Sequence, residues 1–218
     1  MKKLLVSQRI IFEKKTRMYR DALDHQLINF FFKNNFILIP VPNLNLPEIK
    51  IKKFLNDLIN QSEIYGIILS GGNDIKEYRS RDLLEKCLLD ISKKKTIPVF
   101  GICRGMQVMA DYYGIKLKKI KGHVATRHTI TNEKNKDRKI VNSFHNWSIM
   151  DVSSNFEVLY RAKDKSIESF RDKKFKWEAC MWHPEREKLY HKDDCKKIKD
   201  LLISSNAFLG TFISFNFL

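Results

Sequence analysis

The sequence predicts an α/β fold in which a mostly parallel sheet is covered by helices on both faces. Over the first half of the chain, short and continuous apolar runs alternate with stretches of helical periodicity across short loops. Continuous apolar runs are typical of parallel strands, because both faces of such strands are buried. Strand–helix alternation of this kind is typical of a parallel sheet. A chain of 218 residues is long enough to bury the core of one such domain.

The first half of the chain contains a series of strand–helix pairs. Prolines end the second predicted strand, and a glycine turn at Gly71 and Gly72 ends the third. Strands are expected at residues 3–8, 36–41, 66–70 and 97–102. Helices with one apolar face are expected at residues 19–34, 48–61 and 83–91, and from residue 103 onward.

The second half of the chain differs in character. Residues 122–128 and the polar run 131–138 are predicted to be loops. Short strands are expected at residues 139–142, 156–161, 166–171 and 175–181, and a final helix at residues 192–204. The predicted fold is thus a single-domain, flavodoxin-like three-layer sandwich, with a mostly parallel central sheet and a small antiparallel β extension.

We assign residues 1–204 to this domain and residues 205–218 to an apolar tail of unassigned role. The tail is too short, and too often interrupted by polar residues, to span a membrane. The N-terminal apolar run is too short for a signal peptide. The four cysteines lie far apart without a C-x-x-C pair, which argues against a disulfide scaffold or a structural zinc site. This pattern is typical of a protein of the reducing cytoplasm.

The net charge of +16 is high and suits either a nucleic-acid surface or the attraction of small anionic molecules. Most lysines fall in predicted helices and turns, without interleaved aromatic residues. We therefore expect no nucleic-acid partner, while help with an anionic substrate stays open.

The most informative stretch surrounds Cys103, at the end of the fourth predicted strand. Gly101 and Gly105 flank this cysteine at the spacing of a nucleophile elbow, in which small neighbours let a strand turn sharply into a helix. Unpaired N–H groups at the start of that helix would attract negative charge to the sulfur. The alternative is a buried cysteine without a chemical role, because free cysteine often packs as a small hydrophobic residue.

A second motif, His183-Pro184-Glu185, follows the last predicted strand. His183 and Glu185 are two residues apart, so in an extended backbone their side chains project to the same side. Glu185 can then accept a hydrogen bond from one ring nitrogen and leave the other nitrogen for a sulfur. Ligands collect at the carboxyl ends of parallel strands, so we expect this motif, Cys103 and the glycine turn to share one edge of the sheet.

Together these motifs resemble those of the class I glutamine amidotransferase-like superfamily, and within it the γ-glutamyl hydrolases of the peptidase C26 group. The chain is most similar to the small bacterial γ-glutamyl-CDP-amidate hydrolases of that group. The resemblance covers nearly the whole chain and is carried by the segments 70–74, 81–82, 101–107, 122–124, 127–128, 141–145, 166–168 and 182–186.

The resemblance implies a role for each residue of the two motifs. Cys103 is implied to be the nucleophile, His183 the general acid and base, and Glu185 the carboxylate that orients the ring. The backbone N–H of Arg104 and one N–H from the Gly71–Gly72 turn are implied to form the oxyanion hole. The resemblance implies no metal and no organic cofactor.

Substrate-binding roles are implied for residues near the same edge. By position in the family motifs, one group would hold the glutamyl α-amino and α-carboxylate groups: Gln107, Ser143, Phe144 and His145. By position in predicted loops, a second group offers phosphate contacts: Arg9, Arg81, Arg104, Arg127 and His128.

The implied reaction is hydrolysis of a γ-glutamyl amide through a thioester. The resemblance to the small bacterial members implies γ-glutamyl-CDP-amidate of capsular polysaccharide phosphoramidate biosynthesis as the preferred substrate, and the positive charge suits a nucleotide diphosphate leaving group. One alternative substrate is γ-glutamyl-γ-aminobutyrate, and one alternative function is that of a glutaminase subunit serving a separate synthase. A complete triad disfavours a binding module without activity. The sequence gives no oligomeric state.

Overall fold

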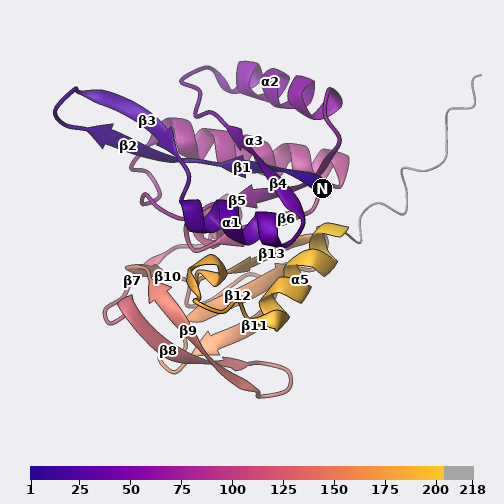
Figure 1. Ribbon diagram of the computed structural model, residues 1–218. Helices are drawn as coiled ribbons and strands as arrows, with labels where there is room; N and C mark the ends of the chain where they lie inside the picture. Colours follow the sequence, from indigo (N-terminus) through magenta and orange to yellow (C-terminus); the bar gives the residue numbers. More distant parts are fainter. Residues whose placement is uncertain (204–218) are drawn as a thin grey trace, which may run out of the picture.

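A nine-stranded sheet runs through the residues that the structure, a computed structural model, describes, which are residues 1–203 (Figure 1). The strand order is β4-β1-β5-β6-β13-β12-β11-β8-β9. The first five strands of this order are parallel, and each later strand is antiparallel to its neighbours. The strands are β1 Lys2–Ser7, β4 Phe36–Val41, β5 Ile64–Leu69, β6 Val99–Ile102, β8 Val124–Asn132, β9 Arg138–Phe144, β11 Phe156–Ala162, β12 Ile167–Asp172 and β13 Trp177–Cys180.

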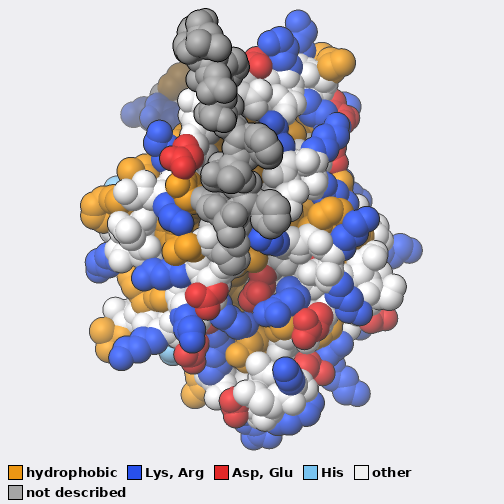
Figure 2. Space-filling view, turned by 90° about the vertical axis from the view of Figure 1, so that its right-hand side faces the viewer, with side chains coloured by type: hydrophobic (Ala, Val, Ile, Leu, Met, Phe, Trp, Pro, Cys, Tyr) orange, Lys and Arg blue, Asp and Glu red, His pale blue; other side chains and the backbone are white. Residues whose placement is uncertain are grey.

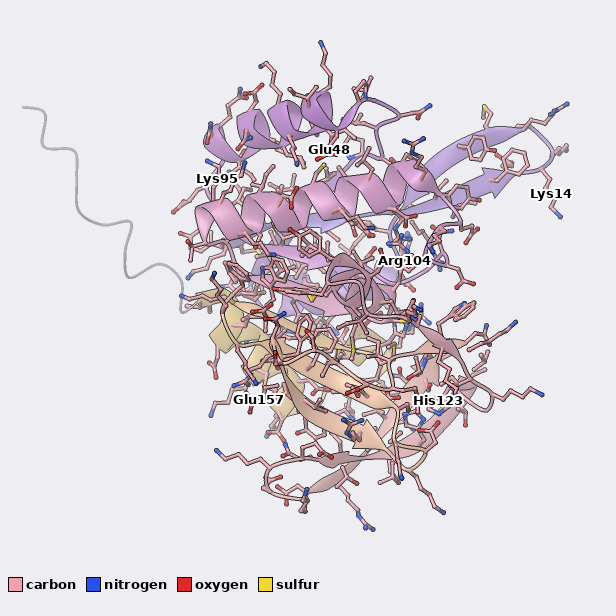
Figure 3. All side chains as sticks on the ribbon, turned by 180° about the vertical axis from the view of Figure 1, so that it is seen from behind. Lys14, Glu48, Lys95, Arg104, His123 and Glu157 are labelled. Atoms are coloured by element: carbon pink, nitrogen blue, oxygen red, sulfur yellow. The ribbon has the colours of Figure 1, made fainter. Side chains whose placement is uncertain are left out.

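Helices cover both faces of the parallel part of the sheet. Helices α3 and α4 lie on one face, where α2 packs against α3, and helices α1 and α5 lie on the other face (Figures 1 and 3). The apolar runs predicted as strands are fully buried between these layers, as at Leu5 and Ile67. The helices are α1 His25–Lys33, α2 Glu48–Asn60, α3 Arg79–Lys95, α4 Arg104–Tyr112 and α5 Lys192–Ile203.

The predicted fold class is confirmed: the protein is α/β, with a three-layer parallel part and an antiparallel part. The antiparallel strands continue the central sheet itself. Two short ribbons and one short helix complete the described elements: β2 Arg9–Glu13 with β3 Met18–Ala22, β7 Lys118–Lys119 with β10 Trp147–Ser148, and the 3₁₀ helix η1 Pro184–Arg186.

The predicted helix that starts at residue 19 is wrong in its first turn. Residues Met18–Ala22 instead form β3, which pairs with β2 (Arg9–Glu13) as a hairpin outside the main sheet. Helix α1 begins only after Asp24, whose carboxylate accepts a hydrogen bond from the Gln26 N–H at 2.9 Å. Pairing within the hairpin overrides the helical spacing of the apolar residues, and the cap at Asp24 sets the start of the helix.

The predicted loop over residues 122–128 is largely wrong as well. Residues Val124–Asn132 form β8, which pairs with β9 along its length and with β11 at its end. Most side chains of β8 are polar and partly exposed, and Ile130 is its one buried residue. Backbone hydrogen bonds to β9 and β11 stabilise β8 although its side chains are mostly polar. Its sequence therefore lacks the continuous apolar run from which the other strands are predicted.

The other predicted strands and helices are confirmed, with shifted ends. The predicted tail over residues 205–218 lies outside the described residues. No helix among residues 1–203 is long and apolar enough to cross a bilayer.

The carboxyl ends of the parallel strands meet at one edge of the sheet. In the strand register, Leu69 lies opposite Gly101, and Ile102 lies opposite Cys180. The residues that follow β5, β6 and β13 are therefore neighbours in space. These are the glycine turn, Cys103 and the segment that leads to His183.

Candidate active site

The chain turns from β6 into α4 at Cys103. The backbone of this residue has φ 51° and ψ −101°, a conformation that residues other than glycine rarely adopt. Helix α4 lies so close to β5 that a Cβ on Gly105 would clash with the Leu69 carbonyl group. A Cβ on Gly101 would lie 2.7 Å from the carbonyl carbon of Gly105. Close packing therefore requires both glycines, and the sharp turn presents Cys103 at the edge of the sheet.

His183 and Glu185 lie beside this turn, after the end of β13. His183 Nδ1 lies 2.6 Å from Glu185 Oε1, and both side chains are buried. A carboxylate only accepts hydrogen bonds, so His183 Nδ1 carries the proton of this bond and Glu185 fixes the ring. Gly71 lies against the ring, because a Cβ at this position would be 2.8 Å from His183 Cε1.

The electrostatic surroundings of His183 favour its protonated form. Burial alone lowers the pKa of His183, but the charges of Glu185 and Cys103, and hydrogen bonds with both, raise it to about 9. The sulfur of Cys103 is thus close enough to interact with the ring. At neutral pH the ring is an imidazolium, which can donate a proton to an atom bound in front of Cys103.

Asn142 at the end of β9 holds the backbone of His183 in place. The His183 N–H donates to Asn142 Oδ1 at 2.9 Å, and Asn142 Nδ2 donates to the His183 carbonyl at 2.7 Å. The sequence motif contains Asn142 but predicts no role for it. The only sequence signal is its place beside Ser143 at a strand end.

One cavity of about 390 Å³ opens in front of Cys103 and His183, within the size range of small-molecule sites. Several predicted site residues line it with them: Arg9, Gly72, Arg104, Gln107, Phe144 and His145. The rest of its wall is polar, and the sequence assigns these residues no role: Asn73, Asp74, Glu77, Asn146 and Arg186. The structure therefore gathers residues from distant parts of the chain around one space.

Four residues predicted to bind substrate do not line this cavity: Arg81, Arg127, His128 and Ser143. Ser143 is buried, and its hydroxyl donates to the His123 carbonyl at 2.6 Å. Arg127 forms an ion pair with Glu187 at 3.0 Å, and His128 faces Glu168. Their roles in substrate binding stay predictions, and these contacts give them local partners within the protein.

A buried network of charges holds the strand ends at this edge together. Glu85 of α3 accepts hydrogen bonds from the Ser7 hydroxyl at 2.7 Å, from Arg81 Nε at 3.1 Å and from Arg104. Arg104 also pairs with Asp82 at 2.5 Å. The guanidinium groups of Arg81 and Arg104 are thus neutralised inside the protein, which disfavours both as phosphate contacts.

Two other arginines bring positive charge to the cavity. Among residues 1–203, no carboxylate lies within ion-pair distance of Arg9. Arg186 lies 3.5 Å from Asp24, and its guanidinium packs over the Phe144 ring at 4.8 Å. The sequence predicts Arg9 from its position after β1, whereas it gives Arg186 no role beyond membership of the His183 motif. Both can contact an anionic part of a bound molecule.

One further group of residues has the composition of a metal site. His123, His128 and Glu168 place side-chain ligand atoms within 4.8 Å of one another. His145 links this group to the cavity, because its Nε2 lies 3.3 Å from His123 Nδ1 and 3.6 Å from Glu168 Oε1.

The sequence and the fold of this chain are similar to those of known proteins. A protein named γ-glutamyl-CDP-amidate hydrolase, from Campylobacter jejuni, is 37% identical over 130 residues, which cover 57% of this chain and 64% of that protein. The match thus spans less than two thirds of that relative. A subunit of the glutamine-hydrolyzing GMP synthase of Methanocaldococcus jannaschii is 25% identical over 138 residues, which cover 60% of this chain and 70% of that protein.

A solved structure with the same fold is a glutamine amidotransferase from Thermotoga maritima. It is 20% identical, with a TM-score of 0.61 over 93% of this chain and 84% of the other. The sequence model of the class I glutamine amidotransferase family matches residues 19–200 of this chain. These residues include the elbow, the glycine turn and the His183 motif. The chain therefore belongs to the class I glutamine amidotransferase family.

Proposed function

We propose that this protein is a cysteine-dependent γ-glutamyl amide hydrolase that releases glutamate through a thioester. The observation that carries the proposal is the meeting of a strained, glycine-flanked Cys103 with the protonated His183–Glu185 pair on one cavity. The similarity to the Campylobacter jejuni γ-glutamyl-CDP-amidate hydrolase supports the same class of reaction.

In the first step, the Cys103 sulfur attacks the γ-carbonyl carbon and forms a tetrahedral oxyanion. The Arg104 N–H is a candidate donor to this oxyanion, because the first N–H groups of a helix have no acceptor within the helix. The carbonyls of Gly71 and Gly72 accept hydrogen bonds from Arg81, which orients the peptides of this turn. One N–H of the turn supplies the second donor in this proposal.

His183 then gives its proton to the leaving nitrogen, and the carbon–nitrogen bond breaks. The product left on the enzyme is a glutamyl thioester on Cys103. In the second step, His183 takes a proton from a water molecule, whose oxygen attacks the thioester carbon. The carbon–sulfur bond breaks, glutamate leaves, and the proton returns to the Cys103–His183 pair.

The proposed substrate is γ-glutamyl-CDP-amidate. Arg9 and Arg186 bring positive charge to the cavity wall, and a nucleotide diphosphate leaving group carries the complementary charge. In this proposal Gln107, Phe144 and His145 contact the glutamyl part, because they line the cavity beside Cys103.

The direct test is mass spectrometry of the protein incubated with γ-glutamyl-CDP-amidate, γ-glutamyl-γ-aminobutyrate and glutamine. We expect glutamate and cytidine diphosphoramidate as products, and faster turnover of the nucleotide compound than of the other two. Cys103→Ala is the matched control and should yield no product. Equal or faster turnover of γ-glutamyl-γ-aminobutyrate would reject the proposed leaving group while keeping the reaction class.

The similarity to a GMP synthase subunit supports a second candidate, a glutaminase that passes ammonia to a separate synthase. The two candidates differ in their response to a partner chain. A hydrolase turns over its substrate fully when alone. A glutaminase of this kind should hydrolyse free glutamine slowly, and a synthase added from the same cells should accelerate it.

A further inference from the structure

Four side chains from three segments of the chain meet next to the catalytic cavity. His123 precedes β8, His128 lies on β8, His145 follows β9 and Glu168 lies on β12. Glu168 is fully buried, and His123 and His145 are nearly so. Figure 3 marks His123 on the antiparallel side of the sheet. The proposed hydrolysis uses none of these groups as an acid, base or nucleophile.

The hydrogen bonds of the His123 and His145 rings leave a lone pair on each of the two ring nitrogens that face each other. His123 Nε2 lies 3.0 Å from Asp164 Oδ2, and His145 Nδ1 lies 3.0 Å from the Trp147 carbonyl. Both oxygens only accept hydrogen bonds, so in neutral rings these two nitrogens carry the protons. The other nitrogens, His123 Nδ1 and His145 Nε2, then carry lone pairs, although they lie only 3.3 Å apart.

Glu168 adds negative charge to the same point. Its Oε1 lies 3.6 Å from His123 Nδ1 and 3.6 Å from His145 Nε2. Its Oε1 also accepts from the Ser166 hydroxyl at 3.3 Å. Its Oε2 lies 3.4 Å from His128 Nε2 without the alignment of a hydrogen bond, and neither of these two buried atoms has a hydrogen-bond partner. A buried carboxylate with an unpartnered oxygen is costly unless a cation is nearby. The cluster therefore gathers acceptors around a position where a cation would satisfy all of them.

We propose that His123, His128, His145 and Glu168 bind a divalent transition-metal cation of the zinc class. Imidazole nitrogens with one carboxylate select such metals over calcium and magnesium, which prefer oxygen ligands. Tetrahedral zinc has bonds of about 2.1 Å, which separate neighbouring ligand atoms by about 3.4 Å. His123 Nδ1, His145 Nε2 and Glu168 Oε1 lie 3.3 to 3.6 Å apart, which fits three corners of this geometry. His128 Nε2 lies 3.4 Å from the other oxygen of Glu168 and within 4.8 Å of the His123 ligand atom, so it can complete the set after a small shift.

The contacts outside the cluster support a metal over a chance arrangement. Metal-binding histidines usually donate their second N–H to a carboxylate or a carbonyl, which fixes the ring. Asp164 does this for His123 and the Trp147 carbonyl does it for His145. Because His145 also lines the catalytic cavity, the metal would fix one wall of that cavity and join β8 to β12.

The test uses the full chain with Cys103→Ala, so that the catalytic sulfur cannot bind the probe. The protein is stripped with a chelator and then titrated with ZnSO₄ in competition with a chromophoric chelator, and separately with CoCl₂. We expect one zinc per chain, a rise in melting temperature with zinc, and the visible absorption of tetrahedral cobalt.

Glu168→Gln and His123→Gln should weaken zinc binding by more than tenfold. Asp164→Asn should weaken it by about 10- to 100-fold through the loss of ring orientation. His25→Gln, at an exposed histidine of α1, is the matched control and should bind like the parent. If Glu168→Gln fails to fold, His128→Gln and Asp164→Asn carry the test.

A Kd for zinc above about 10 µM would overturn the proposal. In that case a proton shared between His123 Nδ1 and His145 Nε2, which lie 3.3 Å apart, would account for the facing nitrogens. Tight binding that Glu168→Gln and His123→Gln leave unchanged would also overturn it. Neither outcome bears on the hydrolase activity, which is measured separately with the intact Cys103.

Discussion

At the scale of single residues, the His183–Glu185 pair sets the pH range in which the protein can donate a proton. The pKa of His183 is raised to about 9, because the charges of Glu185 and Cys103 outweigh the effect of burial. The rate of γ-glutamyl amide hydrolysis should therefore fall above about pH 9, where the ring loses its proton. Glu185→Gln removes one source of the raised pKa, so its alkaline limb should move toward pH 7, as measured by pH profiles of kcat/KM.

The same pair makes the stability of the protein depend on pH. A histidine whose pKa is higher when folded than when unfolded, near 6.5, stabilises the fold most below pH 6.5. This contribution is lost as the pH rises from 6.5 to about 9. Urea unfolding at several pH values should show the loss in the parent and a smaller loss in Glu185→Gln. Parallel pH curves for the two proteins would contradict this role of Glu185.

Arg9 is the residue whose loss should discriminate between substrates. It lines the cavity, and no carboxylate among residues 1–203 lies within ion-pair distance of it. Arg9→Ala should raise KM for γ-glutamyl-CDP-amidate by about tenfold, the loss of one charge-assisted contact, and change KM for γ-glutamyl-γ-aminobutyrate little. Arg171→Ala, outside the cavity and paired with Glu178, is the control and should leave both KM values unchanged in steady-state assays. Equal effects of Arg9→Ala on both substrates would argue against a phosphate contact.

At the scale of elements, the closeness of α4 to β5 depends on Gly105. Alanine at this position would gain about 1 kcal/mol of helix propensity, but its Cβ would clash with the Leu69 carbonyl. We expect Gly105→Ala to lower the free energy of unfolding by about 1–3 kcal/mol and to lower kcat, because the helix would shift away from Cys103. Urea unfolding and activity assays measure both effects.

Gly114 provides the comparison for this substitution. It has a φ of +75° and no atom within 4 Å of an added Cβ, so Gly114→Ala tests backbone strain without a clash. It should cost about 1–2 kcal/mol and leave kcat unchanged. A Gly105→Ala protein as stable and active as the parent would show that α4 can retreat freely from the sheet.

Glu85 joins three elements, since it binds Ser7 at the end of β1, Arg81 of α3 and Arg104 of α4. Glu85→Gln would leave two buried guanidinium groups without their shared carboxylate. We expect a loss of about 3–5 kcal/mol in the free energy of unfolding. Asp57→Asn removes an exposed partner of Lys53 and should cost at most about 1 kcal/mol. Similar costs for both variants, by denaturant unfolding, would mean that the buried network contributes no more than a surface pair.

At the scale of the whole molecule, the net charge of +16 should attract anionic substrates. Lys and Arg side chains are scattered over the face shown in Figure 2, with Asp and Glu side chains among them, so the attraction is spread out. Raising the ionic strength from about 0.01 to about 0.15 M shortens the screening length from about 30 to about 8 Å. KM for γ-glutamyl-CDP-amidate should then rise several-fold in initial-rate assays.

γ-Glutamyl-γ-aminobutyrate is the control for this salt effect, because it carries no diphosphate. Its KM should change little over the same range. Equal changes for both substrates would mean that salt acts on the protein rather than on the encounter with the nucleotide.

The elbow at Cys103 and the buried parallel strands could be predicted from the sequence, for a local reason. A strand buried on both faces is apolar throughout, and a sharp turn beside a close helix needs small residues at Gly101 and Gly105. His183 and Glu185 meet as the spacing predicts, 2.6 Å apart, but the predicted extended backbone is wrong. Glu185 lies in the 3₁₀ helix η1 (Pro184–Arg186), so a turn brings the two side chains together.

Only the tertiary structure decided which distant residues share a contact. Strand β8 is polar and forms because β9 and β11 supply its hydrogen bonds, and Asn142 meets His183 although they are far apart in the chain. Glu85 and Glu168 look like ordinary acidic residues of a helix and a strand, yet each is fully buried among cationic or histidine side chains. Local spacing determines how a segment folds and which way its side chains face. Burial and pairing between segments depend on the packing of the whole sheet, which no single segment of the sequence encodes.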